Sequence, residues 1–257
     1  MDYSIPEMFS LQGEVVLITG AAGGIGCELA YAFGKLGVRL ALADIDQQRL
    51  GRVRARLEEL DVEALYVEMD ITSKKSVEEA VGRIEERCGS IDILINCAGL
   101  SYLEDAVDFD EGQWDRVIGV NLKGTFLSCQ AVGRLMLEQK KGRIVNFSSV
   151  RGCQGRARDM AYAPSKAGID LLTRSLAIEW APHNVNVNAI APAFTLTEMN
   201  RSMLEDAETH RWVLSRIPKA RICSLEDLVG PVVFLCSPCS GFVTGQTIYV
   251  DGGWTAS

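Results

Sequence analysis

A hydroxyl, a phenol and an ammonium group follow one another between Ser149 and Lys166. Tyr162 and Lys166 are four positions apart, so on a helix they share one face. Pro164 between them fits only the first turn of a helix, which places Tyr162 near a helix start. In that arrangement Ser149 could hold a substrate oxygen while Tyr162 transfers its proton.

A proton transfer by Tyr162 at neutral pH requires a shift in its pKa. A free phenol has a pKa of about 10, and a neighbouring cation such as Lys166 stabilises the ionised form. Lowering the pKa to about 7 takes roughly 4 kcal/mol, which a partly buried ammonium and a cationic nicotinamide ring could supply together. The alternative is an exposed tyrosine beside a solvated lysine, and the other motifs decide between the two.

A glycine-rich turn follows the first strand-like run of the chain. Residues 14–18 are mostly apolar, residues 19–26 are rich in glycine, and a helical pattern then continues to Gly37. Glycines let the backbone approach a pyrophosphate closely, and the N-terminus of the following helix offers free N–H groups. The residues expected to bind the phosphates are Gly20, Ala22, Gly23, Gly24, Ile25 and Gly26.

An acidic residue ends the second strand-like run, residues 38–43. Asp44 at this position can accept hydrogen bonds from both hydroxyls of an adenine ribose, and its charge would repel the additional phosphate of NADP. The sequence therefore predicts NAD as the cofactor, with Asp44 and Ile45 at the ribose. Asp70 and Ile71, which follow the third strand, are expected at the adenine edge.

Strand-like and helical patterns alternate along the chain. Further strands are expected at residues 64–69, 91–95, 144–147, 185–190 and 247–250, and helices at 47–60, 74–88, 111–137, 162–180 and 225–235. This alternation predicts an α/β fold with a single doubly wound (Rossmann) domain over residues 1–257, in which a parallel sheet of about seven strands carries helices on both faces. A polar lead-in is expected at residues 1–12 and a mobile substrate lid at about 195–220.

Ligands of such sheets bind beyond the carboxyl ends of the strands. Small and polar residues follow several of the expected strands, so these residues should meet at one edge of the sheet. The further cofactor-binding residues predicted there are Asn96, Ala98, Gly99, Pro192, Thr195 and Thr197, together with Tyr162 and Lys166.

Composition argues against several other classes of protein. The net charge of −8 over 257 residues argues against nucleic-acid binding. No signal peptide is expected at Met1, and no apolar run reaches the length of about 18 residues that a membrane helix needs. Eight cysteines without framework spacing indicate free thiols in a reducing cytoplasm. Cys236 and Cys239 form a close pair, but no second pair matches it, so no metal site is expected.

Taken together, these motifs resemble the short-chain dehydrogenase/reductase family over nearly the whole chain. The matching stretches are Thr19-Gly20-x-x-x-Gly24-x-Gly26, Asn96-Cys97-Ala98-Gly99, Val120-Asn121, Ser149, Tyr162-x-x-x-Lys166 and the loop 192–197. The resemblance implies a nicotinamide-dependent alcohol dehydrogenase or ketoreductase. It also implies a catalytic tetrad of Asn121, Ser149, Tyr162 and Lys166.

The resemblance assigns a role to each of these residues. Tyr162 would be the acid/base, Ser149 would orient the substrate oxygen, and Lys166 would tune Tyr162 and hold the nicotinamide ribose. Asn121 would bind a water in a proton relay, and Thr197 would contact the carboxamide. Three positions depart from the family pattern: Cys97 replaces a usual asparagine, Ala193 replaces the glycine that usually follows Pro192, and Asn186 stands where an arginine is common.

The carboxyl-terminal third is similar to family members that act on sugar acids, such as gluconate 5-dehydrogenases. The 3-oxoacyl-carrier-protein reductases share the same motifs, but they usually prefer NADP, which Asp44 disfavours. A hypothesis from another class is a catalytically silent NAD-binding scaffold. Such a scaffold would tolerate the loss of Tyr162 or Lys166, and both are present.

The placement of arginines suggests an anionic substrate. Arg151, Arg156 and Arg158 lie between Ser149 and Tyr162, and Arg201 lies on the expected lid. A guanidinium there could bind a carboxylate with two hydrogen bonds. We therefore expect a small polyhydroxylated substrate, a sugar acid or a polyol. The alternative is a solvated basic loop that offsets the neighbouring Asp159.

Two long helices are expected to carry more apolar surface than one sheet can cover. Phe126 and Leu135 lie on the first helix, and Leu172 and Leu176 lie on the second. A helix can bury one apolar stripe on a sheet, and a second stripe needs a partner. The family resemblance points the same way, so a homotetramer is expected.

Overall fold

The computed structural model describes residues 4–197 and 205–256. In this part of the chain seven parallel strands form one sheet in the order β3-β2-β1-β4-β5-β6-β7. Their bounds are β1 (Val15–Thr19), β2 (Arg39–Asp44), β3 (Ala64–Glu68), β4 (Ile93–Asn96), β5 (Gly142–Phe147), β6 (Val185–Pro192) and β7 (Thr247–Val250). The strand order reverses between β1 and β4, where doubly wound sheets open a crevice for ligands.

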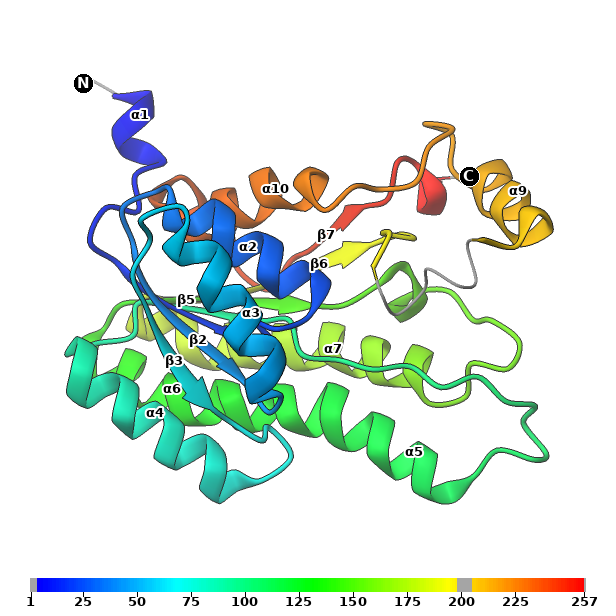
Figure 1. The fold of residues 1–257 in the computed structure, drawn as a ribbon, viewed down its shortest axis with the longest axis horizontal. Helices are drawn as coiled ribbons and strands as arrows, with labels where there is room; N and C mark the ends of the chain where they lie inside the picture. The colour runs from blue at the N-terminus through cyan, green and yellow to red at the C-terminus, as the bar shows by residue number, and fades with distance from the viewer. Residues whose placement is uncertain (1–3, 198–204, 257) are drawn as a thin grey trace.

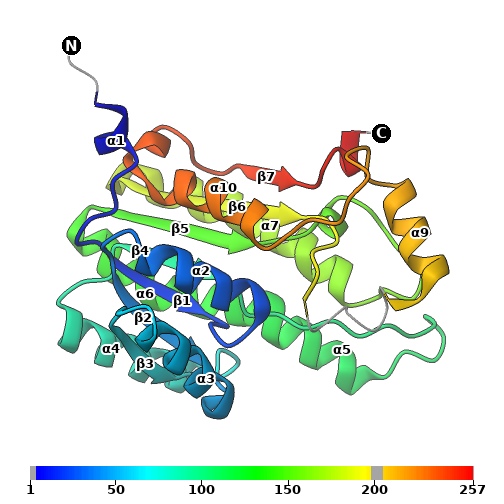
Figure 2. The ribbon, with the colours of Figure 1, turned by 45° about the horizontal axis from the view of Figure 1, so that its top comes forward.

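Helices cover both faces of the sheet (Figures 1 and 2). One face packs against α2 (Gly24–Gly34), α3 (Gln47–Glu58) and α10 (Glu226–Cys236), and the other packs against α4 (Lys74–Cys88), α6 (Thr125–Gln139) and α7 (Tyr162–Trp180). Along β1, Val16 and Ile18 point into the first core and Leu17 points into the second. This two-sided burial explains why the strands read as continuous apolar runs, and the predicted fold class is confirmed.

The long helix expected at residues 111–137 contains an irregularity that the sequence did not predict. The structure has α5 (Glu111–Ile118), a π-helical segment η1 (Gly119–Gly124) and then α6. A π-helical turn inserts an extra residue and often lies at a functional site. Asn121 lies inside η1 and is completely buried, so it is not the exposed polar residue that a regular helix could have carried.

Short helices lie within both the lead-in and the lid that the sequence predicted. The short helix α1 (Ile5–Met8) lies within the expected lead-in, and α9 (Ala207–Ser215) lies within the expected lid, close to the carboxyl terminus (Figures 1 and 2). Residues 198–204 of that lid are outside the described residues, and Arg201 is among them. In the described part of the chain, every helix is too short or too polar to cross a membrane.

Candidate active site

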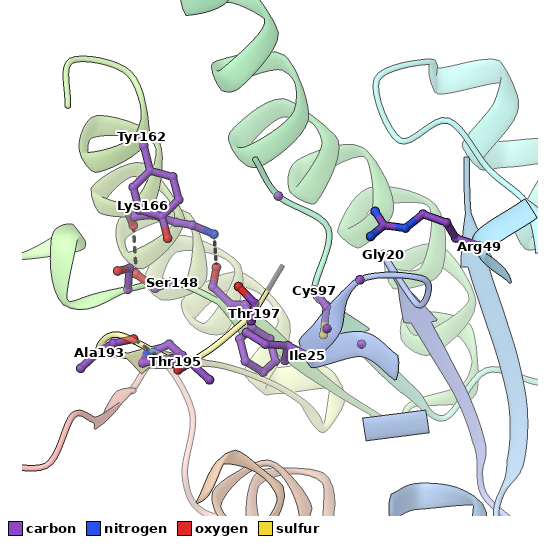
Figure 3. A pocket seen from close by; sticks show the side chains of 17 residues that line it. Gly20, Ile25, Arg49, Cys97, Ser148, Tyr162, Lys166, Ala193, Thr195 and Thr197 are labelled. Carbon is purple, nitrogen blue, oxygen red and sulfur yellow. Dashed lines mark hydrogen bonds between the residues drawn. The ribbon is translucent and has the colours of Figure 1, made fainter. Parts of the chain in front are cut away.

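A cavity of about 450 Å³ opens at the carboxyl ends of the strands (Figure 3). It brings together twelve of the residues that the sequence analysis selected, from five separate segments of the chain. These residues are Gly20, Gly23, Gly24, Ile25, Gly26, Gly99, Ser149, Tyr162, Lys166, Pro192, Thr195 and Thr197. Figure 3 shows Tyr162 and Lys166 on one side of the cavity, with Gly20 and Arg49 on the other.

The glycine-rich turn forms the wall of the cavity with bare backbone. Gly20 has a φ of +66°, and a Cβ on it would lie 2.6 Å from the backbone of Ala98. Helix α2 begins at Gly24, where a Cβ would lie 3.3 Å from the Thr197 side chain. The N-terminus of α2, with its free N–H groups, thus points into the cavity. Side chains in place of these glycines would make the cavity narrower. This geometry fits the pyrophosphate of a dinucleotide, whose negative charge the helix N-terminus favours.

The Asp44 carboxylate is held in place at the end of β2. One oxygen accepts a hydrogen bond from the Ala22 N–H at 2.9 Å and the other accepts one from the Asp46 N–H at 3.0 Å. Each oxygen keeps a second lone pair for a ribose hydroxyl. Arg49 in the first turn of α3 also lines the cavity, although the sequence analysis did not select it. Its position shortly after Asp44 is the signal that could have identified it.

Several residues that the sequence predicted to bind the cofactor do not line the cavity. Ile45 is exposed, whereas Ile71 packs into the core against Gly124. The Asp70 carboxylate accepts hydrogen bonds from the N–H and the hydroxyl of Thr72. Ala22, Asp44, Ile45, Asp70, Ile71, Asn96 and Ala98 are not in the wall of the cavity as described.

Asn96 belongs to a polar network inside the core. Its side-chain N–H donates to Asn146 at 2.9 Å, and its oxygen accepts from the Thr19 hydroxyl at 3.3 Å. Asn146 in turn donates to the Thr173 hydroxyl of α7 at 3.0 Å. The network ties β1, β4, β5 and α7 together beneath the cavity, and the neighbouring Cys97 lines the cavity instead.

Lys166 is anchored to the end of β5. Its ammonium donates to the Phe147 carbonyl at 2.7 Å and lies 5.5 Å from the centre of the Tyr162 ring. The Ser148 hydroxyl donates to the backbone carbonyl of Lys166 at 3.2 Å (Figure 3). Burial lowers the pKa of Lys166 to about 8, so this group can exchange a proton near neutral pH.

Burial has the opposite effect on Tyr162. It raises the pKa of the phenol above its usual value, although the hydrogen bond with Ser149 acts to lower it. The chain alone therefore keeps Tyr162 protonated at neutral pH. Among the protein groups burial has the largest effect on this pKa, and a bound oxidised nicotinamide ring would add positive charge that favours the phenolate.

Asn121 is positioned by the π-helical turn. Its amide donates to the Leu100 carbonyl and the Ser165 hydroxyl, and its oxygen accepts from the Leu100 N–H, all at 2.9 Å. A Cβ on Gly99 would lie 3.4 Å from the Asn121 oxygen and 3.6 Å from the Lys166 ammonium. Both polar atoms therefore face the same small space beside Gly99.

A second cavity of about 230 Å³ shares Ser149 and Tyr162 with the first. Arg151, Arg156 and Asp159 line it, and Ala193 borders both cavities. The Ala193 methyl group thus stands where the two spaces meet, at the position where the family usually has glycine.

Of the charged residues of the second cavity, Arg151 and Arg156 are partly buried and Asp159 is buried. Within the described chain, Nη2 of Arg151 is buried and has no hydrogen-bond partner. Burial and then the charge of Arg156 lower the pKa of Arg151, and burial raises the pKa of Asp159. Arg158, in contrast, forms ion pairs at the surface with Glu104 and Asp105.

Comparison with known proteins gives consistent results. A family model of the short-chain dehydrogenases, described as enoyl-(acyl carrier protein) reductase, matches residues 20–255. The 5-keto-D-gluconate 5-reductase of Escherichia coli K12 is 39% identical over 247 residues, which is 96% of this chain and 97% of that protein. The gluconate 5-dehydrogenase of Gluconobacter oxydans 621H is 35% identical over 254 residues, 99% of each.

A solved structure matches closely as well. The gluconate 5-dehydrogenase of Burkholderia cenocepacia J2315, in complex with NADP and tartrate, superimposes with a TM-score of 0.94. The two sequences are 33% identical, and the match covers 98% of each chain. Because the family model and the relatives span nearly the whole sequence, the chain belongs to the short-chain dehydrogenase/reductase family and is an oxidoreductase.

Proposed function

We propose that this enzyme interconverts a secondary alcohol and a ketone on a sugar acid, with NAD as the preferred cofactor. The Arg151 guanidinium carries the proposal, because Arg151 lines the cavity that Ser149 and Tyr162 also line and its Nη2 has no hydrogen-bond partner in the described chain. A carboxylate in that cavity would pair with the guanidinium and hold the rest of the substrate beside the phenol. The relatives named for gluconate and keto-gluconate support a substrate of this class.

The chain's own residues would divide the reaction between them. A nicotinamide cofactor in the larger cavity supplies the acceptor or donor of the hydride. Ser149 holds the substrate oxygen, and Tyr162 accepts the proton of the alcohol or donates one to the ketone. Lys166, with a pKa of about 8, and Asn121 face one space beside Gly99 and could return that proton to solvent.

The proposal includes the assembly and the compartment of the enzyme. On α7, Leu171 and Ile178 are 63% and 80% exposed and lie on one face, and Phe126 on α6 is also exposed. Leu176, expected in such a stripe, instead belongs to the core. These exposed side chains support a homotetramer. All eight cysteines lie in the described chain with free thiols, which supports a reducing compartment, the cytoplasm.

A Tyr162→Phe variant should lose turnover while binding NAD about as tightly as the wild type. The substitution removes the proton that moves in the transition state and leaves the phosphate site intact. NADH absorbance would measure turnover and calorimetry would measure NAD affinity, with Tyr249→Phe on β7 as the control. A rate above roughly a tenth of wild type, a loss below about 1.4 kcal/mol, would show that Tyr162 is not the acid/base.

NAD should be used with at least about tenfold higher catalytic efficiency than NADP, because a phosphate would face the Asp44 carboxylate. Two like charges about 4 Å apart repel by roughly 4 kcal/mol at an effective dielectric constant of about 20, before screening by salt. Asp44→Ala should narrow the preference, and Asp46→Asn, which removes a charge two residues away, should not. Equal efficiency with both cofactors in the wild type would refute the assignment.

Arg151→Ala should lose roughly 2 kcal/mol of transition-state stabilisation on a sugar acid, about a thirtyfold drop in kcat/KM. The matching neutral polyol should be unaffected, because it lacks the carboxylate. Arg158→Ala, at a surface ion pair, is the matched control. An equal loss on both substrates, or a wild type that prefers polyols or acyl thioesters, would remove the case for an anion site.

Light scattering at micromolar concentration should give about four times the chain mass of 28.1 kDa. Introducing a charge at the exposed face of α7, as in Ile178→Glu, should reduce that mass. The reason is that an unpaired carboxylate in an apolar interface is costly to desolvate. A wild type that scatters as a monomer would contradict the homotetramer.

A further inference from the structure

Trp254, near the carboxyl terminus, is a buried aromatic residue that contacts Arg151 of the second cavity, the one of about 230 Å³. Its side chain is 1% exposed. Asp251 fixes the turn that carries it, since its carboxylate accepts hydrogen bonds from the N–H groups of Gly253 and Thr255 and from the Thr255 hydroxyl. The indole N–H donates to the Gln154 side-chain oxygen at 2.7 Å. The terminal turn is thereby joined to the loop between Ser149 and Tyr162.

The indole ring lies against the guanidinium group of Arg151. The Arg151 Cζ is 5.5 Å from the ring centre, and the Arg216 Cζ is 5.7 Å from the same ring. Cations favour the face of an indole because of its negative potential. Two arginines that repel one another are therefore held beside one ring, and Phe194 and Trp212 pack against that ring at 5.6 and 5.8 Å.

Other contacts fix the Arg151 guanidinium only weakly. Its Nη1 donates to the Gly155 carbonyl at 3.5 Å, which is a long hydrogen bond, and the described residues include no ion pair to it. The aromatic ring is thus the most substantial contact that orients the group. Its Nη2 is buried and without a hydrogen-bond partner in the described chain, and Arg151 lines the cavity that Tyr162 also lines.

We propose that Trp254 is a positioning residue for the anionic end of the substrate. It holds Arg151 so that the guanidinium can pair with a carboxylate while the carbinol carbon lies beside Tyr162. The inference rests on the proposed function, and it adds that selectivity for acids over neutral polyols depends on the carboxyl-terminal turn. Trp254 itself need not touch the substrate.

The test compares Trp254→Leu, which removes the aromatic face, with Trp254→Phe, which keeps one. Trp254→Leu should raise KM for a sugar acid about tenfold with little change in kcat, and it should leave a neutral polyol unaffected. Trp254→Phe should recover most of the selectivity. Trp114→Leu on α5 is the control for replacing a tryptophan outside both cavities.

A double-mutant cycle separates this inference from the proposed function. If Trp254 acts through Arg151, adding Trp254→Leu to Arg151→Ala should cause no further loss on the sugar acid. Additive losses, or equal losses on acid and polyol, would overturn the positioning role. If Arg151→Ala has no selective effect, the proposed anion site fails instead.

A second variant covers the case in which Trp254→Leu does not fold. Gln154 lies in a partly exposed loop, so Gln154→Leu removes the hydrogen bond to the indole without opening the core. It should raise KM for the sugar acid alone, by less than Trp254→Leu would. An unchanged KM for the acid, or a change shared by the polyol, would overturn the proposal by itself.

Discussion

The hydrogen bond from the Lys166 ammonium to the Phe147 carbonyl is the contact on which the active site depends. It joins the second turn of α7 to the carboxyl end of β5 at 2.7 Å. A buried ammonium needs such an acceptor, because an unpaired charge away from water is costly. Once Lys166 is held there, the helix geometry places Tyr162 one turn away on the same face. Ser149, two residues after Phe147, lies beside the phenol and forms a hydrogen bond with it.

The π-helical turn and the core asparagines fix the backbone at the same edge of the sheet, beneath the cavity. The π-helical turn orients Asn121 inward, where its amide holds the backbone of Leu100. Asn96 and Asn146 hold neighbouring strands at the point where the chain leaves the sheet. Buried amides whose hydrogen bonds are satisfied favour one arrangement of these strands, because any other arrangement would leave polar groups without partners. The cavity wall is therefore rigid where the reaction needs fixed distances.

The sequence predicted best those features that depend on local pattern. Tyr162 and Lys166 follow from their spacing and from Pro164, and the seven strands follow from short apolar runs between helices. The direction in which a side chain points at the end of a strand was less predictable. Whether Asn96 or Cys97 faces the cavity depends on the register of β4, which neighbouring strands set. Arg49 was missed because periodicity marks α3 as polar without showing which part of it meets the cavity.

If Arg151 binds the substrate carboxylate as proposed, it links substrate binding to proton transfer. Its positive charge lowers the pKa of Tyr162, whereas the Asp159 carboxylate raises it. A substrate carboxylate on Arg151 would offset that positive charge, so the pKa of Tyr162 would rise when the acid binds. A higher pKa makes the phenolate a stronger base for alcohol oxidation and the phenol a weaker acid for ketone reduction. The oxidised cofactor, whose nicotinamide ring is cationic, would act in the other direction when bound. The balance of these two ligand charges, and not the chain alone, then sets the protonation of Tyr162 during turnover.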